Sequence, residues 1–143
     1  MVINIDQIRK ILPQKPPFLM IDRVLDVEPG KKIIALKNVS MDEILNAHFP
    51  GKSIMPGALI IEIMAQAAIL LYSSINNFQI KESVNYYLGS VKASFLKPVV
   101  PGDQLIIEAT MGKLLSKGFY VEVKAFVKEE KVAESELICM VGI

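Results

Sequence analysis

One apolar stretch, residues 58–72, constrains this chain more than any other feature. It reads ALIIEIMAQAAILLY, contains no Gly or Pro, and places apolar side chains on nearly every side of a helix. A helix that is hydrophobic all round is buried, either in a protein core or in a membrane. The stretch is short for a bilayer, and Glu62 and Gln66 at its centre would be costly in lipid. The sequence therefore predicts a buried central helix, with a membrane span as the alternative.

Composition favours one compact domain that covers residues 1–143. The chain is 52% hydrophobic, which exceeds the usual range and predicts apolar surface buried in a subunit interface or a lipophilic tunnel. Sixteen basic and fifteen acidic residues give a net charge of +1. Nucleic-acid binding needs a clustered positive field, so this balance argues against it.

The rare residue types exclude several kinds of site. Cys139 is the single cysteine and His48 the single histidine, which excludes an internal disulfide framework and argues against a tetrahedral zinc site. Cys139 lies in an apolar run and is expected to be a small buried hydrophobe. The N-terminus resembles neither a signal peptide nor a transit peptide, which favours a cytoplasmic location.

The rest of the chain reads mainly as strands and tight turns. Residues 5–12 predict a short amphipathic helix that ends at Pro13. Pro29 and Gly30 stand where a type II turn requires them, and a second turn is expected at residues 129–131. These features predict an α+β domain in which a curved antiparallel sheet wraps the central helix. The expected strands are residues 18–27, 32–39, 85–96, 104–111, 119–128 and 132–141.

Glu62 and Gln66 are the strongly polar groups of the apolar helix. They are four residues apart, so they share one face. A buried carboxyl is unfavourable unless it is paired, or protonated through a raised pKa. One interpretation is a structural Glu bonded to Gln66 or to loop amides. The other is a carboxyl held in an apolar cleft so that it can exchange a proton near neutral pH.

His48 and the start of the helix supply the other groups that a proton-transfer site needs. His48 lies in a loop fourteen residues before Glu62 (62 − 48), and imidazole suits general-base work at pH 7, although a solvated or capping His is the common alternative. Pro56 and Gly57 mark a helix start, whose free N–H groups can stabilise an oxyanion. Such a set of groups could abstract a proton alpha to a thioester carbonyl and assist departure of a 3-hydroxyl.

Residues 48–67, HFPGKSIMPGALIIEIMAQA, closely resemble the motif HFPGxPxxPGxLxxExMAQ of the (3R)-hydroxyacyl-[acyl-carrier-protein] dehydratases of the FabZ type. The resemblance continues through residues 12–13, 17–24, 37–40 and 95–103. It implies the hotdog fold, a curled antiparallel sheet around a central helix. It also implies a homodimer with a continuous sheet and, in many members, a trimer of dimers.

The resemblance also implies the roles of individual residues. His48 would take the C2 proton, and Glu62 of the other protomer would protonate the leaving hydroxyl. The Gly57 amide would polarise the thioester carbonyl, with Gln66 in support and no metal or organic cofactor. The substrate would arrive on the phosphopantetheine arm of acyl carrier protein. Related dehydratase/isomerases carry Asp at the Glu62 position, so the glutamate implies a plain dehydratase.

Several positions depart from the family pattern. Residues 14–16 read Gln-Lys-Pro where the family usually begins His-Arg, and Ser53, Ser94 and Leu96 also differ. Carrier-protein docking relies on basic surface, for which this chain offers Lys15, Arg23, Lys92 and Lys97, each of which could equally be ordinary solvated surface.

Three further interpretations stay open. Tyr86 falls where some members place a tyrosine that gates the acyl tunnel, and a core tyrosine is the alternative. A hotdog acyl-thioesterase is the alternative enzyme. A non-catalytic acyl-binding subunit is the alternative from another functional class.

Overall fold

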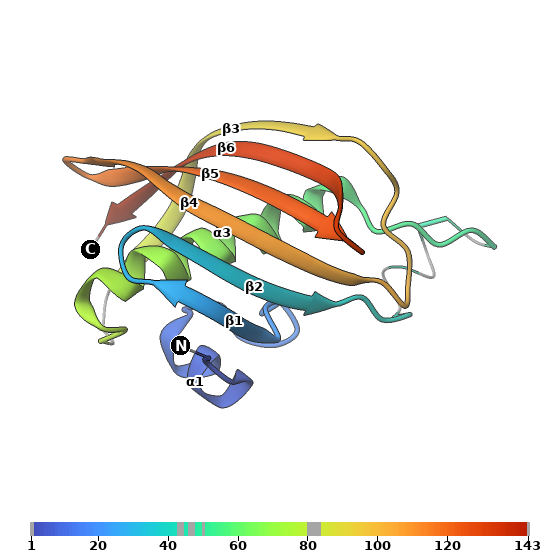
Figure 1. Ribbon diagram of the computed structural model, residues 1–143, viewed down its shortest axis with the longest axis horizontal. Coiled ribbons are helices and arrows are strands. Elements are labelled where there is room, and N and C mark those ends of the chain that lie inside the picture. Colours follow the sequence, from blue (N-terminus) through green and yellow to red (C-terminus); the bar gives the residue numbers. More distant parts are fainter. Residues whose placement is uncertain (1, 43–44, 46–47, 50, 80–83, 143) are drawn as a thin grey trace.

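The computed structural model describes residues 2–42, 45, 48–49, 51–79 and 84–142. Six antiparallel strands form one curved sheet in the order β1-β2-β4-β5-β6-β3 (Figure 1). The sheet curls around one long helix, α3, as the sequence predicts. The strands are β1 (Arg23–Glu28), β2 (Lys32–Asn38), β3 (Asn85–Phe95), β4 (Gln104–Leu115), β5 (Gly118–Val127) and β6 (Glu130–Gly142).

Helix α3 runs over Gly57–Ser73 and continues into a short 3-10 turn, η1 (Ser74–Asn76). From Ile63 to Leu71 every residue of α3 is buried, so the helix is enclosed on all sides as an all-apolar helix must be. The segment Gly57–Asn76 is long and apolar enough to cross a membrane, but 67% of its apolar 18-residue window is buried inside the protein. Burial of this extent is the pattern of a core helix.

Turn chemistry explains the hairpins. The β1–β2 turn closes through a hydrogen bond from the Lys31 N–H to the Glu28 carbonyl (2.9 Å). Gly30 has φ +72° there, the positive value that the third position of a type II turn needs. The β5–β6 turn consists of Lys128 and Glu129, both with positive φ, so it lies one residue earlier than predicted.

Two strands differ in length from the prediction. β1 begins at Arg23 rather than at residue 18, because the Phe18 carbonyl and the Met20 N–H are bonded to Gln66 of α3 instead of to a strand. β4 runs on to Leu115, past a bulge between Met111 and Lys113. Gly112 permits this bulge, because a Cβ there would lie 2.3 Å from the Tyr120 ring. A bulge breaks the two-residue periodicity from which strands are recognised in sequence.

The N-terminal helix α1 (Ile5–Ile11) begins with a capping box between Asn4 and Gln7 and ends before Pro13, as predicted. Its Ile8 is fully buried, and Leu12 that follows is 1% exposed. These contacts fix the chain as it enters the segment that crosses α3.

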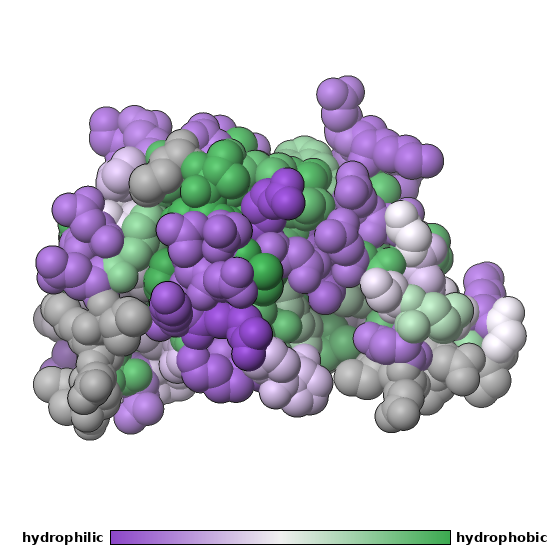
Figure 2. Space-filling model, turned by 90° about the horizontal axis from the view of Figure 1, so that it is seen from below, coloured by the Kyte–Doolittle hydropathy of each residue, from purple (hydrophilic) through white to green (hydrophobic). Residues whose placement is uncertain are grey.

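The edge strand β3 pairs with β6 alone. Tyr87, Val91 and Phe95 on it are 58%, 40% and 48% exposed. Apolar surface also remains elsewhere on the molecule, where green patches interrupt the polar face in Figure 2. An edge strand of eleven residues with exposed apolar side chains is unusual for a protein that stays alone, because such an edge invites pairing.

Candidate active site

Helix α3 places Glu62 and Gln66 on one face, as predicted. The Gln66 side chain is completely buried. Its Nε2 donates to the Phe18 carbonyl (2.8 Å) and to Glu62 Oε2 (3.3 Å), and its Oε1 accepts from the Met20 N–H (2.8 Å). One amide therefore orients the carboxyl and fastens the N-terminal segment to the helix.

Burial raises the pKa of the Glu62 carboxyl above its ordinary value of 4.5, and the hydrogen bond from Gln66 opposes this effect in part. Desolvation disfavours the ionised form, whereas a donor stabilises it. A raised pKa keeps more of the carboxyl protonated near neutral pH. The group can therefore donate a proton.

A small cavity of about 60 Å³ lies beside Glu62. Gln14, Tyr86 and Cys139 share its lining with the carboxyl. The Cys139 thiol is 2% exposed, as expected of a small buried hydrophobe. Burial and the nearby Glu62 charge raise its pKa to about 12, so it stays protonated.

The His48 ring is held by the loop that precedes α3. Its Nδ1 lies 2.9 Å from the Ile54 carbonyl, which can only accept, so Nδ1 carries the hydrogen. The ring also stacks on Phe49 with a centroid separation of 4.3 Å. Because one nitrogen of a neutral imidazole is protonated and the other is not, Nε2 is left as a base. Pro50, within the predicted motif, lies outside the described residues.

The amino end of α3 has free amides. Pro56 occupies the N-cap position and provides no side-chain cap, and the first turn contains no acidic residue. Among the described residues, the Gly57 and Ala58 N–H groups have no hydrogen-bond acceptor. With the positive end of the helix dipole, these amides suit an oxygen that gains negative charge.

The ring of Phe95, on β3, covers Gly57. A Cβ at Gly57 would lie 3.0 Å from the tip of that ring, so the absence of a side chain permits this approach. The chain's sequence alone gave no reason to single out Phe95. Its position near Gly57 depends on how β3 crosses the helix.

The structure brings Glu62 and Gln66 together but does not pair His48 with Glu62 in one copy. Within the described part of the chain, no hydrogen bond joins them. Glu62 lies five residues into the helix, about 7.5 Å along its axis from Gly57. The loop before α3 projects past the end of the sheet (Figure 1).

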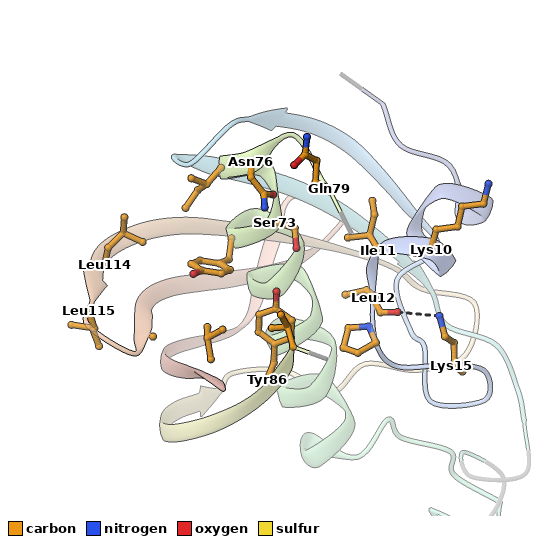
Figure 3. A pocket seen from close by; sticks show the side chains of 16 residues that line it. Lys10, Ile11, Leu12, Lys15, Ser73, Asn76, Gln79, Tyr86, Leu114 and Leu115 are labelled. Carbon is orange, nitrogen blue, oxygen red and sulfur yellow. Dashed lines mark hydrogen bonds between the residues drawn. The ribbon is translucent and has the colours of Figure 1, made fainter. Parts of the chain in front are cut away.

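A larger cavity of about 600 Å³ lies at the other end of α3. Its lining is partly apolar, from Ile11, Leu114 and Leu115, and partly polar, from Ser73 and Asn76 (Figure 3). Tyr86 lines both this cavity and the small one beside Glu62. The predicted tunnel residue thus stands between the carboxyl and a space large enough for an aliphatic chain.

Two of the four basic residues suggested for carrier docking, Lys15 and Lys97, already have partners within the chain. Lys15 donates to the Arg9 carbonyl (2.7 Å) and the Leu12 carbonyl (3.3 Å), which completes the end of α1. Lys97 pairs with Glu130. In the described part of the chain, no three His, Cys, Asp or Glu side chains cluster as a metal site would require.

Comparison with known proteins identifies the family. A family model described as a FabA-like domain matches residues 12–136. This chain belongs to the FabA-like family. A 3-hydroxyacyl-[acyl-carrier-protein] dehydratase FabZ of Clostridium tetani is 45% identical over 139 residues, which is 96% of each chain. Thus the similarity within the FabA-like family is to members named FabZ.

Other comparisons show the same family and fold. A bifunctional enzyme LpxC/FabZ of Chlorobaculum tepidum is 44% identical over 98% of this chain, which spans 30% of that protein's length. The dehydratase heterocomplex ApeI:P of Xenorhabdus doucetiae superposes with a TM-score of 0.79 at 18% identity, over 95% of this chain and 91% of that one. At that identity the likeness shows the fold alone, and this FabA-like chain has the hotdog fold.

Proposed function

We propose that this chain dehydrates (3R)-hydroxyacyl-[acyl-carrier-protein] to the trans-2-enoyl thioester in fatty acid biosynthesis. Residues 1–143 act as a single cytoplasmic dehydratase domain that needs no cofactor. The observation that carries the proposal is the half-buried Glu62 carboxyl with its raised pKa, on the core helix of a FabA-like chain. Relatives named as dehydratases of this substrate match nearly the full chain.

In the proposed reaction, His48 Nε2 removes the proton from C2 of the substrate. The Gly57 N–H binds the thioester oxygen, which gains negative charge as the C2–H bond breaks. Protonated Glu62 then gives its proton to the 3-hydroxyl, the C3–O bond breaks, and water leaves. The Nδ1 bond to the Ile54 carbonyl (2.9 Å) supports the base, because it holds the tautomer in which Nε2 accepts.

The site is completed by a second copy of this chain, paired along β3. Three features of β3 support this. The strand is a free edge with exposed apolar side chains, its Phe95 covers Gly57, and its Tyr87 lines the cavity beside Glu62. A partner that extends the sheet at β3 would lie next to both groups, and could bring its own His48 to Glu62. Further assembly into a trimer of dimers belongs to the same proposal.

The acyl chain would run from Glu62 past Tyr86 into the larger cavity. The apolar side chains and the volume of about 600 Å³ fit a lipophilic tail, and Tyr86 borders both cavities. Rotation of the Tyr86 ring would therefore open or close the passage. The carrier protein would dock on basic surface at Arg23 or at Lys92, which lie on the opposite edge strands β1 and β3, while Lys15 and Lys97 bond to other residues of the chain.

The decisive experiment follows the purified protein with 3-hydroxyacyl-carrier protein by mass spectrometry. We expect loss of water, and a fall in turnover of about 100- to 10,000-fold for His48→Ala and for Glu62→Gln, the range for loss of a general acid or base. Glu129→Gln, at an exposed turn, is the matched control and keeps the wild-type rate.

Other outcomes identify the alternatives. Release of free thiol without enoyl product indicates a thioesterase. Tight binding of the substrate without turnover indicates an acyl-binding subunit. Wild-type turnover in either the His48 or the Glu62 variant contradicts the assigned roles.

A further inference from the structure

The small cavity beside Glu62 contains an unused acceptor. Its volume of about 60 Å³ exceeds the roughly 10–15 Å³ that one water molecule needs. Gln14 lines it, and the Gln14 Oε1 atom is buried with no hydrogen-bond partner among the described residues. Leaving a buried acceptor unpaired is unfavourable, so such an atom needs an explanation.

The position of Gln14 is fixed from both sides. Upstream, Leu12 is 1% exposed in the core and its N–H donates to the Ile8 carbonyl (2.9 Å). Downstream, Gln66 holds the Phe18 carbonyl and the Met20 N–H at 2.8 Å each. The short segment between these anchors crosses α3, so Gln14 faces the carboxyl because of the tertiary structure and not because it is nearby in sequence.

A protonated Glu62 needs a hydrogen-bond acceptor for its proton, and Gln14 Oε1 is such an acceptor. Gln66 Nε2 donates to Glu62 Oε2, so the other carboxyl oxygen is the one free to carry the proton into the cavity. The remaining polar lining groups are poorer acceptors. Cys139 has a thiol, a weak acceptor. The Tyr86 hydroxyl already interacts with Ser73, and Tyr87 is 58% exposed, so solvent can reach its hydroxyl. The Gln14 carbonyl oxygen is the strong acceptor left for this proton.

We propose that Gln14 positions the general acid, with its Oε1 accepting the Glu62 proton through a water held in the shared cavity. The inference rests on the proposed function. This bond keeps the proton-bearing oxygen aimed into the cavity before substrate enters. The substrate 3-hydroxyl then replaces that water, the carboxyl proton passes to the hydroxyl oxygen, and the C3–O bond breaks. The released water takes up the bond to Gln14.

The test compares Gln14→Met, which keeps length but removes the acceptor, with Gln14→His, whose neutral ring retains one. We expect kcat of Gln14→Met to fall about tenfold, which corresponds to loss of one hydrogen bond, with KM within about twofold. Gln14→His restores most of the rate. Gln104→Met, at an exposed glutamine of β4, is the control and changes neither constant.

A double-mutant cycle separates positioning from general damage. When Glu62 is replaced by Gln, the amide can still donate a hydrogen bond but has no acidic proton to transfer, so Gln14 has no general acid to position. Adding Gln14→Met should then lower the residual single-turnover rate by less than about twofold. A full tenfold further loss would overturn the inference, as would a kcat for Gln14→Met equal to wild type. If the Glu62→Gln rate is below detection, two measurements test the inference instead. Gln14→Met should lower kcat and leave KM nearly unchanged, and Gln14→His should recover most of the rate. Absence of wild-type turnover would instead contradict the proposed function.

Discussion

Replacing Gln66 by Met removes the amide that joins α3 to the N-terminal segment. Methionine has nearly the same length and fills the buried site, so the change leaves no large cavity. It does remove the partners of the Met20 N–H and the Phe18 carbonyl, each bonded at 2.8 Å. It also removes the donor to Glu62 Oε2.

The loss of stability can be worked from these contacts. The Met20 N–H bond is buried, and an unpaired buried donor costs about 1–3 kcal/mol. The Phe18 carbonyl belongs to a residue that is 52% exposed, so water can replace its partner and it adds less. We expect Gln66→Met to lose about 2–3 kcal/mol of unfolding free energy, or about 6–12 °C in Tm for a chain of this size.

Thermal and urea denaturation at one fixed protein concentration measure this loss, since an oligomer's stability depends on concentration. Gln104→Met removes a surface amide that donates to Asn38 Oδ1 (3.3 Å), and should change stability by less than about 0.5 kcal/mol. Equal stability of the two variants would refute the claim that Gln66 anchors the segment. In the Gln66 variant the pKa of Glu62 should also rise, because its donor is gone. The alkaline limb of the kcat–pH profile then moves to higher pH.

Four other changes test the site. Burial raises the pKa of Glu62, so its ionisation makes wild type less stable as pH rises from about 4.5 through the folded-state pKa. Glu62→Gln cannot ionise, so its Tm should exceed that of wild type increasingly across this pH range. Below the range the difference in Tm should vanish. Gly57→Ala keeps the backbone N–H but places a methyl 3.0 Å from the Phe95 ring. It should lower kcat/KM by about tenfold if the methyl blocks access to that N–H, whereas equal kinetics would show that the site does not need a glycine there. Val91→Glu puts a charge on the exposed edge of β3. Light scattering should show monomers, and the turnover assay should show no activity. Tyr86→Ala should raise kcat/KM for long acyl chains relative to short ones, and an unchanged ratio would argue against a gate.

Local patterns in the sequence predicted much of this molecule. The all-apolar run around Glu62 predicted a buried helix, and Pro29-Gly30 predicted the first hairpin, because both depend on neighbours along the chain. The strand boundaries were less predictable. The bulge near Gly112 interrupts the alternation on which a strand assignment depends, and Lys128-Glu129 adopts positive φ without the Gly or Asn that would mark a turn.

The sequence by itself also determined which groups can transfer protons. The imidazole of His48 can act as a base, and a carboxyl within an apolar helix has a raised pKa in any fold that buries the helix. Only the tertiary structure decided which groups meet. Hydrogen bonds from Gln66 to residues more than forty positions away bring Gln14 to the Glu62 cavity, and the strand order leaves β3 as a free edge beside the same carboxyl. Such contacts join distant parts of the chain, and no local periodicity encodes them.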